Sequence, residues 1–211
     1  MTIEASCDET PRPVLTIACV KVGSKYSDLY VKRLNAGIRR WMPADVRYEF
    51  VCFCDKPIVG VLSESLPARL PGWFSKLELF ALREPLLYFD LDVVITGSLQ
   101  PLLDWDGFGV INDYWMPGYN TSVMKLTGDE HHVWDNFAPD SAANMRRLYL
   151  GDQQWVTEQM PGARTFPPHY FPSYKANKCF EAPPSDAMAV VFHGEPKPCQ
   201  ISTGWVPELW R

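Results

Sequence analysis

The sequence predicts an α/β domain with a mostly parallel central sheet and helices on both of its faces. Two observations support this class: the chain opens with a strand, helix, strand pattern, and a later apolar strand ends in two aspartates. Strands that are joined through helices favour parallel pairing with right-handed crossovers. Because 211 residues suffice for one substantial core, we expect residues 1–211 to form a single domain.

The side chains of residues 14–54 show the strand, helix, strand pattern directly. Residues 14–20 form an apolar, β-branched run that predicts the first strand. Residues 28–41 carry apolar side chains at helical spacing with charges between them, and residues 46–54 predict the second strand.

A helix and a buried strand follow. Residues 75–83 predict a helix, with Leu77, Phe80 and Ala81 turned inward. Residues 86–89 are apolar throughout and predict a buried strand. This strand delivers whatever follows it to the carboxyl edge of the sheet, where open α/β sheets bind their ligands.

The second half is less regular. Prolines become frequent from residue 161 onward, and we expect Trp205 and Trp210 to pack a C-terminal tail onto the body. The segments that predict strands are 93–95, 107–112, 119–126 and 187–193, and those that predict helices are 129–137, 142–150 and 152–160.

Asp90 and Asp92 stand two residues apart between apolar strands. Two ionised carboxylates in such surroundings cost several kcal/mol unless positive charge meets them. Hard oxygen ligands suit Mg²⁺ and Mn²⁺, so a divalent cation is the natural compensator. The alternative is a turn or N-cap aspartate beside one salt-bridged partner.

Three further polar clusters follow the aspartate pair along the chain. Together with Asp90-x-Asp92 they form an ordered set of four motifs: Asn120-Thr121-Ser122-Val123-Met124, Asp152-Gln153, and Gly194-Glu195-Pro196-Lys197-Pro198. In this order they resemble the nucleotide-sugar glycosyltransferases of the GT-A (Rossmann-like) fold, and within them the glycogenin and bacterial lipopolysaccharide galactosyltransferase family. The resemblance covers roughly residues 14–200 and implies that residues 14–112 bind the nucleotide sugar and residues 113–211 the acceptor.

The resemblance implies a metal-dependent transferase that moves a sugar from a nucleotide-diphosphate donor, a UDP-sugar by preference, with retention at the anomeric carbon. Asp90, Asp92 and His193 would hold Mn²⁺ or Mg²⁺, and Asn120, Asp152 and Gln153 would orient the sugar. The donor-binding residues would be Val20, Lys21, Tyr26, Lys76, Asp90, Leu91, Gly194 and Lys197.

The sequence departs from the family at one metal ligand. The family's histidine precedes the glycine by three residues, a position that Val191 occupies here, whereas His193 directly precedes Gly194. If the strand continues, residues 191 and 193 share a face, so His193 still reaches the metal. Ser122 stands where the family often has glycine.

Two other functions compete with the transferase. One is a nucleotide-sugar-binding module without catalysis, against which the pair Asp152-Gln153 argues. The other is a haloacid-dehalogenase-type phosphatase using Asp90 and Asp92, although that motif normally opens a chain. The acceptor stays open between a glycan, a lipid-linked saccharide, a protein and a modified nucleobase. Trp115 is either packing or a platform for a sugar ring.

Composition limits the partners and the compartment. The net charge of −5 gives no general attraction to nucleic acid or anionic membranes. The first thirteen residues lack the pattern of a secretory signal, and no window has the length of a membrane span. Cys19, Cys52 and Cys54 lie in strand-like runs and read as reduced core thiols, so we expect a cytoplasmic protein.

Overall fold

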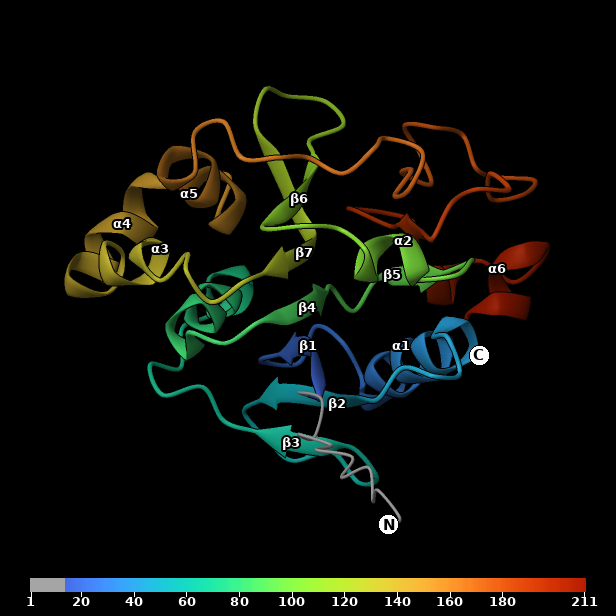
Figure 1. The fold of residues 1–211 in the computed structure, drawn as a ribbon, viewed down its shortest axis with the longest axis horizontal. Coiled ribbons are helices and arrows are strands. Elements are labelled where there is room, and N and C mark those ends of the chain that lie inside the picture. Colours follow the sequence, from blue (N-terminus) through green and yellow to red (C-terminus); the bar gives the residue numbers. More distant parts are fainter. Residues whose placement is uncertain (1–13) are drawn as a thin grey trace, which may run out of the picture.

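The computed structural model describes residues 14–211, and its central feature is a six-stranded sheet (Figure 1). The strand order is β3-β2-β1-β4-β7-β6. Strand β7 runs antiparallel to both of its neighbours, and the other pairings are parallel, which confirms a mostly parallel sheet. The strands are β1 (Leu15–Lys21), β2 (Tyr48–Cys54), β3 (Leu62–Glu64), β4 (Leu86–Phe89), β6 (Gly109–Asn112) and β7 (Tyr119–Leu126).

A second, two-stranded sheet lies beside the first. It pairs β5 (Val93–Ile95) antiparallel with β8 (Ala189–Val191). Because β5 directly follows the aspartate pair, this sheet brings the C-terminal part of the chain next to Asp90 and Asp92. The backbone N–H of Phe192 donates to the carbonyl of Asp92 at 3.1 Å.

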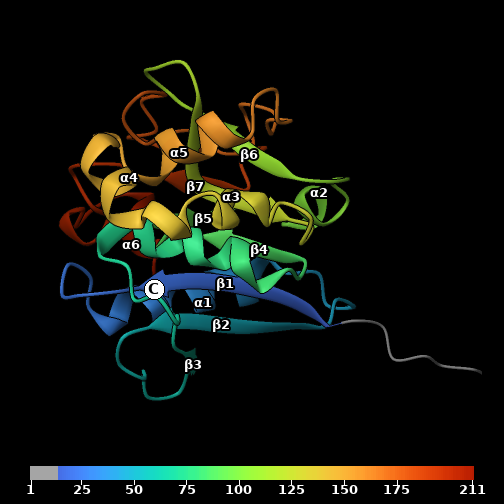
Figure 2. The same ribbon diagram turned by 90° about the vertical axis from the view of Figure 1, so that its left-hand side faces the viewer.

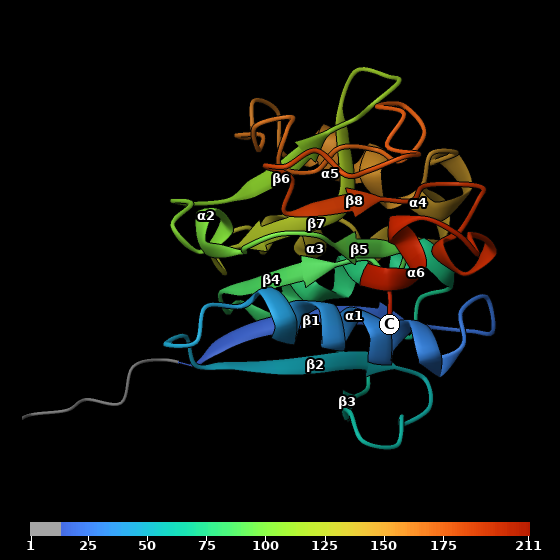
Figure 3. The same cartoon turned by 90° about the vertical axis from the view of Figure 1, so that its right-hand side faces the viewer.

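Helices cover both faces of the central sheet, as the sequence predicts. On one face lie η1, α3, α4 and α5 (Figure 2), and on the other lie α1, α6 and the small sheet (Figure 3). The helices are α1 (Asp28–Trp41), the 3₁₀ helix η1 (Gly72–Leu82), α2 (Gln100–Leu103), α3 (His132–Asp135), η2 (Ala138–Asp140), α4 (Ser141–Arg147), α5 (Asp152–Gln159), η3 (Pro198–Gln200) and α6 (Trp205–Leu209).

Helix α1 has the predicted bounds because its sequence signals agree. Asp28 lies in the first turn, and Arg39 and Arg40 lie in the last turn, so each charge complements the helix dipole. Leu34 and Ile38, four residues apart, are buried against the sheet.

Alternating side chains of the strands build two hydrophobic cores, one on each face. In β4, Leu87 and Phe89 join the core under α1, whereas Leu86 and Tyr88 join the core under η1 and α5. The same alternation turns Tyr88 and Asp90 to one side, and the Tyr88 hydroxyl donates to Asp90 Oδ1 at 2.5 Å.

Several predicted elements differ from the structure. Ala81 is exposed rather than turned inward, because η1 is a 3₁₀ helix with three residues per turn. The predicted helix over residues 129–137 is only the short α3, and the chain then enters η2 with Pro139 in its first turn. Strand β3 was not predicted, since its three residues give too short a pattern.

The C-terminal tail packs as predicted, with Trp205 and Trp210 buried. The cysteines of the described residues are free, and Cys19, Cys52 and Cys54 are buried. No helix within residues 14–211 has the length and apolarity needed to cross a membrane. The prediction that the first thirteen residues carry no secretory signal lies outside the described residues.

Candidate active site

A cleft of about 540 Å³ opens at the carboxyl end of the parallel strands. Val20 lies at the end of β1, and Asp90 directly follows β4, the strand beside β1. The chain passes from β1 to β2 on one side and places β4 on the other, so the strand order reverses here. Such a reversal is where open α/β sheets hold their ligands.

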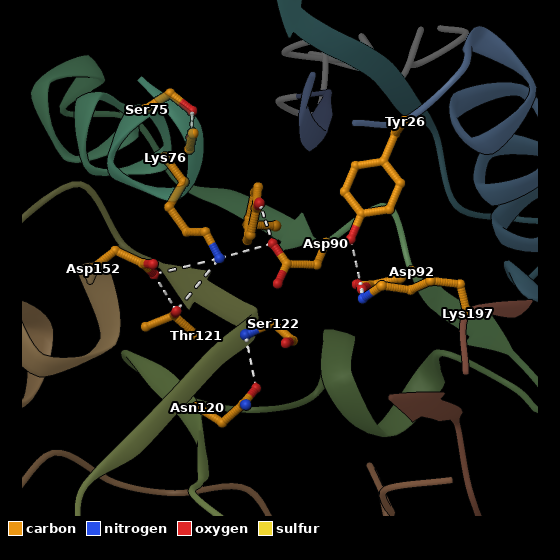
Figure 4. A network of polar contacts seen from close by, with 12 residues as sticks. Tyr26, Ser75, Lys76, Asp90, Asp92, Asn120, Thr121, Ser122, Asp152 and Lys197 are labelled. Atoms are coloured by element: carbon orange, nitrogen blue, oxygen red, sulfur yellow. Dashed lines mark hydrogen bonds and ion pairs between the residues drawn. The ribbon is translucent and has the colours of Figure 1, made fainter. Parts of the chain in front are cut away.

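One group of side chains in the cleft is centred on Lys76, which η1 supplies (Figure 4). The Lys76 ammonium lies 2.8 Å from Asp90 Oδ1 and 3.4 Å from Asp152 Oδ2. Thr121 of β7 accepts a hydrogen bond from Lys76 at 3.4 Å and donates one to Asp152. Lys76 therefore joins the end of β4, strand β7 and the start of α5.

Burial and charge act against each other in this group. Burial lowers the pKa of Lys76, but Asp152 and Asp90 outweigh it and hold that pKa above its usual value. Burial raises the pKa of Asp90, yet Lys76 and the Tyr88 hydroxyl outweigh it and leave that pKa lowered. For Asp152 burial prevails over Lys76 and Thr121, so the pKa of Asp152 is raised.

The second group is centred on Asp92 and lies at the right of Figure 4, where no dashed line joins it to the first group. Lys197 donates to Asp92 Oδ2, and the Tyr26 hydroxyl donates to the same oxygen at 2.8 Å. The side chains of Lys197 and Asp92 are only 11% and 9% exposed. Lys197 also donates to the carbonyl of Phe192 at 3.1 Å, which fixes the ammonium at the carboxylate.

The charged side chains of the cleft balance one another when His193 is neutral. Burial and Lys175 lower the pKa of His193, which favours the neutral ring. Three aspartates then oppose three lysines, giving a formal sum of zero; they are Asp90, Asp92, Asp152, Lys25, Lys76 and Lys197.

Asn120 and Gln153 complete the polar wall. Asn120 is buried, and its Oδ1 accepts from the backbone N–H of Ser122 at 3.0 Å. Gln153 lies in the first turn of α5 and lines the cleft. This turn starts from Gly151, whose φ of +74° favours glycine and whose absent Cβ leaves room for the Trp73 indole.

His193 and Gly194 form the edge of the cleft beyond β8. His193 Nε2 lies 2.7 Å from Ser173 Oγ, and its ring stacks on Tyr114 with centroids 5.1 Å apart. The strand β8 ends at Val191, so the shared strand face that we expected for residues 191 and 193 does not continue to His193. Gly194 has a φ of +64° and lines the cleft.

The predicted metal ligands do not form a three-residue centre. Within residues 14–211 no group of three His, Cys, Asp or Glu side chains is arranged to hold a metal ion. Asp90 and Asp92 both face the cleft, whereas His193 is hydrogen-bonded to Ser173. A divalent cation fits the remaining pair, since Mg²⁺ is commonly held by one or two carboxylates together with substrate phosphates and water.

The cleft gathers nearly all of the predicted site residues. Lys21 is the exception: its ammonium pairs with Asp28 at 3.3 Å, and it does not line the cleft. The predicted residues that line it are Val20, Tyr26, Lys76, Asp90, Leu91, Asp92, Asn120, Asp152, Gln153, His193, Gly194 and Lys197.

Sequence reasoning missed other lining residues. Thr121 lies inside one of the four motifs, but only the fold shows that its hydroxyl donates to Asp152. Trp73 precedes Lys76 by three residues, and the resemblance implied a donor-binding role for Lys76 alone. Lys25 neighbours Tyr26, and no pattern marked it. These three line the cleft together with Val22, Gly72, Ser75, Tyr88, Ser122 and Leu150.

Comparisons with known proteins give a clear result for the fold alone. No protein-family model and no curated protein sequence matches the chain. Solved structures do match, at low identity. The galactosyltransferase LgtC in complex with donor and acceptor sugar analogues has a TM-score of 0.64 and 13% identity, covering 87% of this chain and 89% of that one.

Two further glycosyltransferases match over most of this chain. GlyE of Streptococcus pneumoniae TIGR4 has a TM-score of 0.71 and 12% identity, and the match covers 93% of this chain and 60% of GlyE. Mouse xyloside xylosyltransferase 1 has a TM-score of 0.52 and 12% identity, covering 86% of this chain and 98% of that one. The chain therefore has the GT-A fold of these glycosyltransferases, which confirms the fold that the four sequence motifs predicted.

Proposed function

We propose that this protein is a glycosyltransferase that moves a sugar from a nucleotide-diphosphate sugar to an acceptor, with a divalent cation as cofactor. The observation that carries the proposal is the cleft itself. Asp90 and Asp92 face it from the carboxyl end of β4, and two buried lysines meet them there. Glycosyltransferases share the fold that builds this cleft.

The charge balance supports both the diphosphate and the cation. The charges of the aspartates and lysines of the cleft sum to zero, so the cleft by itself exerts no net attraction on a doubly negative diphosphate. A divalent cation held by Asp90 and Asp92 would give the cleft the two positive charges that balance the diphosphate. The cation would then supply Lewis-acid stabilisation of the departing diphosphate.

Lys197 supplies the second contact to the diphosphate in this proposal. Its ammonium lies on Asp92 in the structure, and a cation bound to Asp92 would compete for that carboxylate. The donor diphosphate offers Lys197 a new anionic partner on the same side of the cleft. Gly194, without a side chain, lets the backbone approach the phosphates closely. Lys197 would stabilise the negative charge that develops on the diphosphate as the glycosidic bond breaks.

The sugar then lies against the wall that carries Asn120, Asp152 and Gln153. Lys76 and Thr121 hold the Asp152 carboxylate in a single orientation, which preorganises it for sugar hydroxyls. The Gln153 side chain enters from the first turn of α5 and would face the anomeric carbon. His193 stays outside the proposed metal-binding pair because its Nε2 contacts Ser173.

The finer assignments rest on the sequence resemblance. They are a UDP-sugar donor, whose base would stack on Tyr26, and retention at the anomeric carbon. In a retaining front-face reaction, the acceptor hydroxyl oxygen forms a bond to the anomeric carbon on the face from which the diphosphate leaves. A diphosphate oxygen takes the hydroxyl proton, and the bond between the anomeric carbon and the diphosphate breaks. The fold, which glycosyltransferases share, favours the transferase over the phosphatase alternative.

The experiment is a thermal-shift screen of nucleotide sugars with and without Mn²⁺, followed by an assay for donor hydrolysis. A ligand that binds the folded state raises the melting temperature of the protein, so the donor can be recognised by the rise that it causes. We expect one class of nucleotide sugar to stabilise the protein in Mn²⁺ and to be hydrolysed slowly. Stabilisation without any turnover would favour the binding module, and no stabilisation by any nucleotide sugar would refute the proposal.

A further inference from the structure

Two tryptophans within the described residues are exposed: Trp73 lines the cleft, and Trp115 contacts the lining residue His193 without lining the cleft itself. The chain has eight tryptophans, all within the described residues, and six of them are buried or half-buried. Trp115 is 67% exposed and Trp73 is 56% exposed. Tryptophan joins a large apolar ring to a polar N–H group and is enriched at binding surfaces, so two exposed indoles beside a polar cleft favour a binding role.

Trp115 lies beside the proposed transfer site. Its ring is edge-on to the ring of His193, with centroids 6.3 Å apart, and His193 lines the cleft. The indole belongs to the loop between β6 and β7, which rises from the body at the top of Figure 1.

The loop around Trp115 is held in a defined turn. Asp113 Oδ1 accepts from the backbone N–H of Trp115 at 2.8 Å and from that of Met116 at 2.9 Å. The Tyr114 hydroxyl donates to the carbonyl of Phe171 at 2.7 Å, and its ring stacks on His193. These contacts fix the backbone on both sides of Trp115 although its indole stays in solvent, which is the arrangement of a preformed binding surface.

Trp73 is fixed in a different way. It lies at the start of η1 and lines the cleft three residues before Lys76. The indole packs over Gly151, where an added Cβ would come within 2.4 Å of its Nε1. The glycine that begins α5 therefore makes the space that Trp73 occupies.

We propose that Trp73 and Trp115 form the acceptor subsite of this protein and that the acceptor is a saccharide. This inference rests on the proposed transfer reaction and names the chemistry of its second substrate. The apolar C–H faces of a pyranose stack on indole rings, while its hydroxyls need polar groups of the kind that line this cleft. A nucleic-acid acceptor fits poorly, because the aspartates and lysines that line the cleft cancel and the whole chain carries a charge of −5.

The test measures saccharide binding directly and then in the reaction. Saturation-transfer NMR is recorded with lactose, maltose and the methyl α- and β-glycosides of glucose and galactose, without and with UDP and Mn²⁺. We expect at least one of these sugars to bind the unmodified protein. Trp115→Ala should weaken that binding about tenfold, the usual scale for removing an aromatic anchor, and Trp115→Phe should restore much of it. Phe180→Ala is the control, since Phe180 is 54% exposed and does not line the cleft.

The kinetic arm separates this inference from the proposed function. Trp115→Ala should raise the acceptor KM while the donor KM stays the same. Sugar binding that depends on Trp115 in a protein that hydrolyses no nucleotide sugar would leave the subsite standing and remove the transferase. Binding that is equal in the unmodified protein, Trp115→Ala and Trp73→Ala would overturn the subsite, as would the absence of binding by every sugar of the panel.

Discussion

Replacing Lys76 by methionine should turn a satisfied buried cluster into one with two unpaired carboxylates. The Lys76 side chain is 8% exposed, and it is the ammonium that meets both Asp90 and Asp152. Methionine keeps the unbranched shape but brings no charge. Removing one partner of a buried ion pair costs about 3–5 kcal/mol.

The lower end of that range applies here. Asp90 is 24% exposed and keeps the hydrogen bond from Tyr88, and Asp152 keeps the one from Thr121. We therefore expect a loss of about 3 kcal/mol in the free energy of unfolding at pH 7. For a chain of this length, such a loss lowers the melting temperature by about 6–12 °C.

The loss should depend on pH. Burial already raises the pKa of Asp152, and without Lys76 that pKa moves further above the unfolded value of about 3.9. A carboxyl whose pKa is raised by folding destabilises the protein fully above the folded pKa, and the penalty disappears as the pH falls through it. The deficit of Lys76→Met should therefore shrink between pH 7 and pH 5.

Urea unfolding at pH 7, 6 and 5 measures the deficit. The matched control is Lys125→Met, because the Lys125 ammonium donates to the backbone carbonyls of Leu102 and Leu103 and leaves no paired carboxylate behind. Its deficit should not follow the pH. Adding Asp152→Asn to Lys76→Met should recover most of the stability. A deficit below about 1 kcal/mol, the scale of an exposed ion pair, or one that is constant from pH 7 to 5, would refute the role of Lys76.

Three further predictions concern the cleft. Asp92→Asn removes the carboxylate that meets Lys197 and Tyr26, and it should abolish sugar transfer in Mn²⁺ with an unchanged circular-dichroism spectrum; near-normal turnover would contradict the metal assignment. Lys197→Met should weaken binding of the donor at least about tenfold, the value of one charged hydrogen bond, in a calorimetric titration, and equal affinities would remove Lys197 from the diphosphate site. Gly151→Ala forces a side chain onto the Trp73 ring at a positive φ and should cost about 1–3 kcal/mol in urea unfolding, whereas Gly162→Ala, also at positive φ but with open space, should cost less.

The sequence by itself determined the architecture and the place of the chemistry. Apolar runs located the strands β1, β2 and β4, and helical spacing located α1, because both signals are local patterns of apolar side chains. The aspartate pair after β4 indicated the sheet edge at which the cleft opens. Four short motifs in order led to the fold that the comparisons confirm.

Only the tertiary structure decided which charges meet. No pattern in the chain shows that Lys76 joins Asp90 to Asp152, or that Lys197 lies on Asp92, because these partners are separated by 14, 76 and 105 residues. The pairing comes from the sheet order, which sets η1, β7 and the segment after β8 around one cleft.

The exposure of the two tryptophans and the winding of η1 could also be learned only from the fold. Tryptophan is usually a packing residue, so exposure at Trp73 and Trp115 emerges only when the neighbouring surfaces are placed. Ala81 is exposed because η1 winds as a 3₁₀ helix, and sequence periodicity cannot tell that winding from an α-helix over so few turns. Local sequence thus specifies which segments form and what chemistry they carry, while long-range packing specifies which side chains act together.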